Sequence, residues 1–292
     1  MAQNFLWCDR DQALLMPPSL RDWLGHDEFG DARGDELPQE LADPVTRRAR
    51  LQEAKRQIEA EHQAAKDAHR ERMQQRAELE AEQGHKIRGR TPKGPSEQVP
   101  SHTRVNITDR DSRSVKTQQG FIQGYNAQAA ATSEQIIIAA EIIGNGNDYG
   151  LLEPLADAAV GELAAAGISE QIDVVLADAG FWASEQIENL AARGMRQLVP
   201  PDGQHSKRSP GANRKGPRYD FMRQVIASDT GRALYSQRKH TIEPVFGQIK
   251  HNRRIARFQR RGIQACRSEW RLIATTHNIL KLWRTNTAPA TA

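Results

Sequence analysis

A carboxylate and an ammonium group are predicted to lie on one edge of a short amphipathic helix. Glu243 and Lys250 are seven residues apart, which places them about 20° apart around a helix that turns about 100° per residue. An acid and a base would therefore stand side by side, next to a buried face. The alternative interpretation of Glu243 is a surface carboxylate that stabilises the first turn of its helix.

Basic residues crowd around this glutamate. Between residues 236 and 284 the chain has twelve Lys and Arg against two Glu, whereas residues 1–45 carry ten acids and three Arg. Such an asymmetry indicates a polyanionic partner for the C-terminal part of the chain. The basic residues nearest to Glu243 are Arg238, Lys239, His240, Lys250, Arg253 and Arg254.

Asp178 is a second candidate for chemistry because it follows a predicted strand. The run Ile172–Ala177 is apolar apart from Asp173, which is typical of a strand buried on both faces. In α/β sheets, ligands and catalytic groups gather where such strands end. Gly180 allows the chain to turn away sharply after the strand. A turn or helix cap is the alternative role for Asp178 considered by itself.

The helix that must position Glu243 is predicted to begin near Thr241. A proline is tolerated in the first turn of a helix but not in its interior, so Pro244 favours Thr241 as the N-cap. Glu243 then falls in the first turn. The predicted buried stripe follows the spacing i, i+3, i+4, i+7 and consists of Ile242, Val245, Phe246 and Ile249.

These positions resemble the catalytic motifs of DDE transposases from bacterial insertion sequences. The pattern Tyr235-x2-Arg238 followed by Glu243-x6-Lys250 resembles the signature around the last catalytic glutamate. Four residues separate Arg238 from Glu243, where the family has three, and Lys239 stands at the family distance. Asp178-x-Gly-Phe resembles the second catalytic motif. The likeness covers roughly residues 1–25 and 31–284, including Asn106–Gln128, Glu269–Trp270, His277–Asn278 and Leu280–Leu282.

The resemblance implies DNA transposition by metal-dependent strand cleavage and transfer at insertion-sequence ends. In that chemistry, three carboxylates hold two Mg²⁺ ions about 3.5–4 Å apart. Asp178 and Glu243 are then the expected catalytic and metal-binding residues, and double-stranded DNA is the expected partner. The side chains expected to contact DNA phosphates are Arg238, Lys239, Lys250, Arg253, Arg254 and Arg257.

The first catalytic aspartate of the family has no counterpart in the sequence. In the family it lies in an Asp-Gly-Thr-like element on the first, central strand, whereas the Asp-Gly of this chain, Asp202–Gly203, stands elsewhere. No apolar strand is predicted before the long helix. We therefore expect an internally deleted copy with impaired activity. Asp109 and Asp111 are alternative sources of the missing carboxylate.

The predicted fold is α/β, with a ribonuclease-H-like mixed sheet flanked by helices and preceded by a long charged helix. Two strands joined by a turn at Ser133–Gln135, followed by the order α-β-α-β, indicate this class. The first central strand is predicted to be missing. The expected strands are 121–132, 136–143, 172–177 and 196–199, and the expected later helices lie around 155–163, over 184–193, from 241 and over 265–283.

Four regions are predicted along the chain. The long helix, Thr46–Gln83, repeats apolar residues every seven positions, but Arg72 interrupts the repeat. A solvated helix docked by one thin seam and an oligomerising coiled coil are both compatible with this pattern. The regions are a residual N-terminal segment with an acidic linker (1–45), the long helix with a basic Pro/Gly-rich linker (46–104), the catalytic domain (105–284) and a disordered tail (285–292).

The composition and the distribution of apolar residues argue against a membrane-spanning protein. Of the 292 residues, 38% are hydrophobic, and no apolar run approaches the roughly 20 residues needed to span a bilayer. Cys8 and Cys266 are isolated, so a reduced, cytoplasmic protein is expected. A homo-oligomer is expected as well, because a missing strand would leave the edges of 121–132 and 172–177 unpaired.

Two other classes of function stay open from the sequence. One is a non-catalytic DNA-binding remnant that regulates or inhibits an intact transposase. The other is a helical interaction protein in which the sheet serves only as a scaffold.

Overall fold

The computed structural model divides into two compact units, Asp35–Asp111 and the remainder of the chain. No helix among the described residues is long and apolar enough to cross a membrane. Most of the predicted N-terminal segment, Asp202–Gly203 and the end of the predicted tail lie outside the described residues. The described residues are 5–8, 39–87, 90–117, 120–144, 146–201 and 216–287.

The smaller unit contains the predicted long helix. Helix α1 spans Gln39–Ala42, and α2 spans Pro44–Gln83 with Asp43 as its N-cap. Of the residues of α2, Ala54 is buried, so the helix is largely solvated. The irregular segment that follows α2 is held along it by hydrogen bonds, for example from Gln57 Nε2 to the carbonyl of Arg110 at 3.3 Å. Leu51 and Leu79 of the seven-residue repeat are 50% and 45% exposed, so docking by that seam and coiled-coil association both stay predictions.

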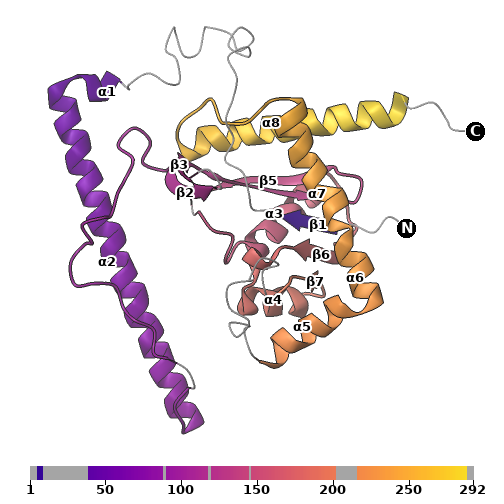
Figure 1. Ribbon diagram of the computed structural model, residues 1–292, viewed down its shortest axis with the longest axis horizontal. Coiled ribbons are helices and arrows are strands. Elements are labelled where there is room, and N and C mark those ends of the chain that lie inside the picture. The colour runs from indigo at the N-terminus through magenta and orange to yellow at the C-terminus, as the bar shows by residue number, and fades with distance from the viewer. Residues whose placement is uncertain are drawn as a thin grey trace, which may run out of the picture. The chain divides into compact units, whose positions relative to one another are not determined.

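The larger unit is built around two sets of paired strands (Figure 1). β4 (Asn126–Ala131) and β5 (Ile137–Ile143) form an antiparallel hairpin, as predicted. β6 (Val174–Ala177) pairs in parallel with β7 (Arg196–Leu198). All four residues of β6 are buried, as expected for a strand with packed side chains on both faces. The α/β class is confirmed.

A strand is present before the long helix, where none was predicted from the sequence. β1 (Phe5–Cys8) precedes the long helix and pairs in parallel with β6, in a register that aligns Phe5 with Val174 and Cys8 with Ala177. It also contacts β4, although no backbone ladder joins these two strands in the described part of the chain. The expectation that no strand precedes the long helix is therefore wrong. Four residues are too short a run for a pattern to indicate a strand, and the open edge of β6 supplies the partner.

The predicted strand 121–132 is interrupted at Tyr125. Its first half is β3 (Gly120–Gly124), which pairs with β2 (Arg113–Thr117) in a separate antiparallel ribbon. Its second half is β4. The interruption follows from pairing, because the two halves have different partner strands.

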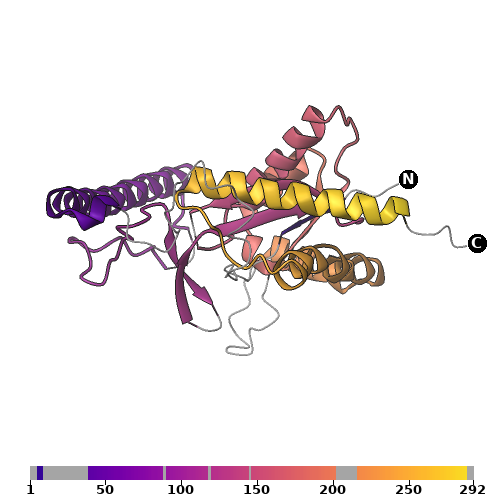
Figure 2. The ribbon, with the colours of Figure 1, turned by 90° about the horizontal axis from the view of Figure 1, so that it is seen from above.

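Helices cover the strands on both faces. α3 (Leu152–Ala165) packs on β4 and β5 from one side, and α7 (Arg238–Gly247) contacts β1 and β4 from the other (Figures 1 and 2). α8 (Ile263–Thr287) packs along β5. The remaining helical elements are the 3₁₀ turn η2 (Ala179–Phe181), α4 (Ser184–Ala192), α5 (Pro217–Ala227), α6 (Asp229–Ser236) and the π-helical turn η3 (Gln248–Asn252).

α8 bonds the backbone of the β4–β5 hairpin through polar side-chain groups. The Asn278 amide accepts a hydrogen bond from the backbone N–H of Ile137 and donates to its carbonyl, both at 2.8 Å. Trp270 is buried and its indole N–H donates to the carbonyl of Gln128 at 2.8 Å. Exposed edge groups favour unwanted strand pairing, and these contacts satisfy them within the chain.

Candidate functional site

Asp178 lies where the sequence predicted it, directly after the buried strand β6. Its side chain is half-buried, and Oδ1 accepts a hydrogen bond from the backbone N–H of Gly180 at 2.7 Å. Asp178 is thus the N-cap of η2. The cap considered as the alternative is therefore present, and it holds the carboxylate at the end of the strand.

A second carboxylate, Asp148, lies beside Asp178 and was missed in the sequence. A Cβ added to Gly180 would stand 2.9 Å from Asp178 Oδ1 and 3.1 Å from Asp148 Oδ2. Asp148 is only 1% exposed, and its Oδ1 accepts hydrogen bonds from the side-chain amides of Asn126 (2.8 Å) and Gln128 (2.9 Å). Only glycine leaves room for the two acids to approach the turn. Two amide side chains in the otherwise alanine-rich strand β4, Asn126 and Gln128, were the sequence feature that could have indicated a buried polar partner.

The helix that carries Glu243 begins earlier than predicted. α7 starts at Arg238, with Pro244 in its interior, so Thr241 is not the N-cap. A proline in this position deprives the carbonyl four residues earlier of its helical donor. That carbonyl belongs to His240, and it accepts instead a hydrogen bond from Gln135 Nε2 at 2.7 Å. The tertiary contact compensates for the proline, which no local pattern could indicate.

The predicted buried stripe of this helix is confirmed, but the position of Lys250 is changed. Ile242, Val245 and Ile249 are fully buried, and Phe246 packs against the core. Lys250 lies in the π-helical turn η3, so the angular relation to Glu243 expected for an α-helix does not apply. Its Nζ stands 5.2 Å from the centre of the Phe246 ring.

Tyr235, Arg238 and Glu243 form one group of contacts that links the two predicted motifs. Arg238 Nη2 pairs with Glu243 Oε1 at 3.3 Å, and the Arg238 guanidinium lies 5.7 Å from the centre of the Tyr235 ring. The Tyr235 hydroxyl donates to the carbonyl of Ala177 at 3.4 Å. Ala177 immediately precedes Asp178, so a chain of contacts connects the end of β6 with the start of α7.

The basic residues predicted to contact DNA differ in their surroundings. The Arg238 side chain is 13% exposed and pairs with Glu243. Arg253 is half-buried, and its guanidinium donates to the Ile273 carbonyl (3.1 Å) and the Thr276 hydroxyl (2.6 Å) of α8. Burial lowers the pKa of Arg253. The exposed members of the set are Lys239, Arg254 and Arg257.

The loop between η3 and α8 is held by a glutamate from α8. Both carboxylate oxygens of Glu269 accept from the backbone N–H of Gln259, at 2.8 and 3.0 Å, and Oε2 also accepts from that of Arg260 at 3.1 Å. Burial of the side chain raises the pKa of Glu269 despite these donors. Glu269 therefore fixes the loop that presents Arg254 and Arg257.

The carboxylates do not form a complete metal centre in the described part of the chain. No group of three or more His, Cys, Asp or Glu side chains there is arranged to hold a metal ion. Asp178 Oδ1 is engaged with Gly180, and Glu243 is engaged with Arg238. Asp109 and Asp111, the suggested replacements for the missing acid, belong to the smaller unit.

A comparison with known protein families gives a match in the C-terminal part of the chain. Residues 212–283 match the family model described as "Transposase DDE domain". This match includes Tyr235, Arg238 and Glu243, and it ends within α8. No curated protein and no solved structure matches the chain.

Proposed function

We propose, from the premise that residues 212–283 carry a DDE transposase domain, that this protein acts in DNA transposition by binding double-stranded DNA at the site built around Asp178 and Glu243. The proposal is supported most by the contacts from Ala177 through Tyr235 and Arg238 to Glu243. These contacts connect the motif of Glu243, which lies inside the family match, to the motif of Asp178, which lies outside it. A ribonuclease-H-like sheet with β1 as its central strand is part of the proposal.

In this function, DNA phosphates that flank the site are bound by the exposed cations Lys239, Arg254 and Arg257. Contacts of this kind position a duplex without reading its sequence. Arg238 has a different role, because its guanidinium holds the Glu243 carboxylate beside Tyr235. A cation near clustered acids also offsets their mutual repulsion.

A divalent metal ion is expected from the family, and Mg²⁺ suits carboxylate oxygens. Asp178 and Glu243 are the side chains of this chain that would contribute ligands. The described residues do not complete the set, and this incomplete donor set favours an impaired enzyme. The alternative function, a DNA-binding remnant that regulates an intact transposase, is supported by the same observation.

Nicking of a supercoiled plasmid in the presence of Mg²⁺, measured beside DNA binding by fluorescence anisotropy, separates these functions. An impaired transposase gives slow nicking that Asp178→Asn and Glu243→Gln abolish while DNA binding persists. A remnant binds DNA with a steep salt dependence and gives no nicking. A chain that neither nicks nor binds DNA at low salt would refute both. Glu71→Gln, an exposed change on α2, is the matched control for loss of a carboxylate.

The homo-oligomer stays a prediction. It was expected from unpaired strand edges, and β1 now pairs with the edge of β6. Exposed apolar side chains of α8, such as Leu272 and Ile279, offer a separate reason for self-association. Sedimentation velocity over a range of concentrations measures this directly.

A further inference from the structure

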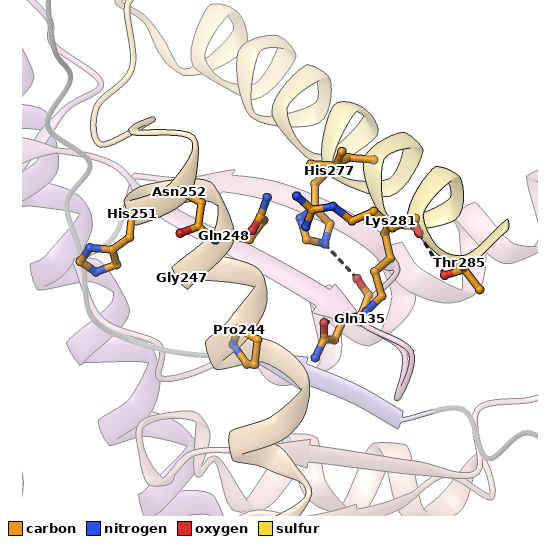
Figure 3. Close-up of a pocket in the computed structure, with 11 residues that line it drawn as sticks. Gln135, Pro244, Gly247, Gln248, His251, Asn252, His277, Lys281 and Thr285 are labelled. Atoms are coloured by element: carbon orange, nitrogen blue, oxygen red, sulfur yellow. Dashed lines mark hydrogen bonds between the residues drawn. The ribbon is translucent and has the colours of Figure 1, made fainter. Parts of the chain in front are cut away.

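A basic pocket lies between α7, η3 and the C-terminal half of α8 (Figure 3). Its volume is about 570 Å³, and the turn of the β4–β5 hairpin closes one side through Gln135. Four cationic or titratable side chains line it, His251 from η3 and His277, Lys281 and Arg284 from α8. Lys281 and Arg284 do not belong to the set of cations predicted to contact DNA, which lies between Arg238 and Arg257.

The lining combines positive charge with polar donors. No carboxylate is among the described residues that line the pocket, and Lys281 Nζ donates to a neutral partner, Gln135 Oε1, at 3.0 Å. Glu134 is the acid near Lys281, and its Oε1 accepts from the Ser133 hydroxyl at 2.7 Å. The amides of Gln248 and Asn252 and the hydroxyl of Thr285 complete the polar lining. Such a set of cations and neutral donors suits an oxyanion.

His277 supplies an independent indication that the pocket takes a ligand. It lines the pocket and is only 4% exposed. Its Nε2 lies 3.0 Å from the carbonyl of Gln135, so this nitrogen carries the proton. The second nitrogen, Nδ1, is buried and has no hydrogen-bond partner among the described residues. An unsatisfied buried polar atom costs free energy unless a ligand or water completes it.

We infer that this pocket binds a phosphate group, with Lys281 and Arg284 as its charged ligands and His277 as a proton-dependent donor. A neutral His277 offers Nδ1 as an acceptor, whereas a protonated one offers an N–H. The charged groups that act on His277 are Arg253, Lys281 and Arg284, all cationic, and His251 shares the pocket. They oppose protonation, and a bound oxyanion offsets them. Binding is therefore coupled to the uptake of a proton. The inference does not depend on strand cleavage.

Titration calorimetry of the full chain with sulfate and with inorganic phosphate tests the site. Sulfate keeps its charge between about pH 5.5 and about pH 8, so a pH dependence of its affinity reports on the protein. The double variant Lys281→Gln/Arg284→Gln should lower the affinity for both anions at least about tenfold. The control pair Arg48→Gln/Arg72→Gln on α2 removes the same charge from exposed positions and should change the affinity little. His277→Gln should remove most of the pH dependence of sulfate binding.

DNA binding distinguishes the two sources of the phosphate group. If the pocket holds the backbone of DNA, the Lys281→Gln/Arg284→Gln variant lowers the slope of log affinity against log salt by about two, since each phosphate contact contributes about 0.9. If anion affinity falls and the salt slope does not, the pocket takes a free phosphate compound. Equal anion affinity in the pocket variant and in the control pair would overturn the inference. Circular dichroism of each variant verifies that it is folded, and plasmid nicking reports separately on the proposed function.

Discussion

At the scale of single residues, two adjacent arginines, Arg253 and Arg254, have different roles. Arg253 and Arg254 are adjacent in the sequence, where both were predicted to contact DNA. Arg253 is half-buried and bonded to two oxygens of α8, whereas Arg254 is exposed and has a left-handed backbone, with φ 55°. Residue type and position in the sequence could not distinguish a structural arginine from a surface arginine.

This difference predicts opposite effects of two matched substitutions. Arg253→Ala should lower the free energy of unfolding by about 1–3 kcal/mol, because it removes the hydrogen bonds from the guanidinium to the Ile273 carbonyl and the Thr276 hydroxyl. Arg254→Ala should change it little, yet weaken DNA binding and flatten its salt dependence by about one unit. Urea unfolding and fluorescence anisotropy measure the two quantities. Equal loss of stability in both variants would contradict the structural role of Arg253.

The buried His277 predicts a dependence of stability on pH. Burial lowers the pKa of His277, and the cations Arg253, Lys281 and Arg284 add to this effect. In the unfolded chain this imidazole takes up its proton near pH 6.5, whereas in the folded chain it does so at a lower pH. The unfolded state therefore binds more protons in this window, and the free energy of unfolding falls as the pH drops below about 6.5.

Urea unfolding of the wild type and of His277→Gln between about pH 5 and about pH 7.5, in a buffer without phosphate or sulfate, measures this contribution. The decline toward acidic pH should be shallower in the variant. His240→Gln is the control, because His240 is exposed. A decline of the same steepness in wild type and His277→Gln would show that other groups cause it.

At the scale of elements, α7 depends on a distant hairpin turn. Pro244 removes the donor that the His240 carbonyl would have in a regular helix, and Gln135 replaces it across the fold. The same turn accepts a hydrogen bond from His277 and one from Lys281. The β4–β5 turn is therefore a junction between α7 and α8, and it borders the pocket between them.

A double-mutant cycle between Gln135 and Pro244 should reveal this compensation. Gln135→Ala should cost about 1–2 kcal/mol in the wild-type background, since the His240 carbonyl then loses its donor. In the Pro244→Ala background the helix supplies its own N–H, so the same substitution should cost less. The strain of the left-handed backbone at Gln135, with φ 65°, is common to both backgrounds and cancels. Equal costs in both backgrounds would disprove the compensation.

At the scale of the whole molecule, the larger unit is completed by residues from the beginning of the chain. β1 pairs with β6 although about 170 residues separate them in the sequence. A parallel strand in this position satisfies the backbone groups on one edge of β6, the strand that leads to Asp178. The integrity of the candidate site thus depends on β1.

Deletion of residues 5–8 should expose that edge. We expect the free energy of unfolding to fall by about 3 kcal/mol or more, and amide hydrogen exchange at Val174–Ala177 to become much faster, because the partner of these residues is lost. Deletion of residues 288–292 is the control and should leave exchange at β6 unchanged. Unaltered protection of β6 after removal of 5–8 would mean that the pairing does not stabilise the sheet.

The sequence by itself determined the local features of this protein. A helix-forming composition without Gly or Pro was sufficient for the long helix. Short apolar runs were sufficient for the β4–β5 hairpin and β6, and apolar periodicity was sufficient for the buried stripe of α7. The motif from Tyr235 to Lys250 was sufficient to indicate the transposase family that matches residues 212–283. Each of these features is encoded in one continuous stretch of the chain.

Tertiary structure decided what depends on partners far apart in the sequence. β1 is a strand because β6 offers an open edge, and α7 continues through Pro244 because Gln135 supplies a donor. Asp148 reaches Asp178 because Gly180 leaves room between them. Burial and hydrogen bonding across such distances leave no periodic trace in the sequence, and for that reason they appear only in the folded chain.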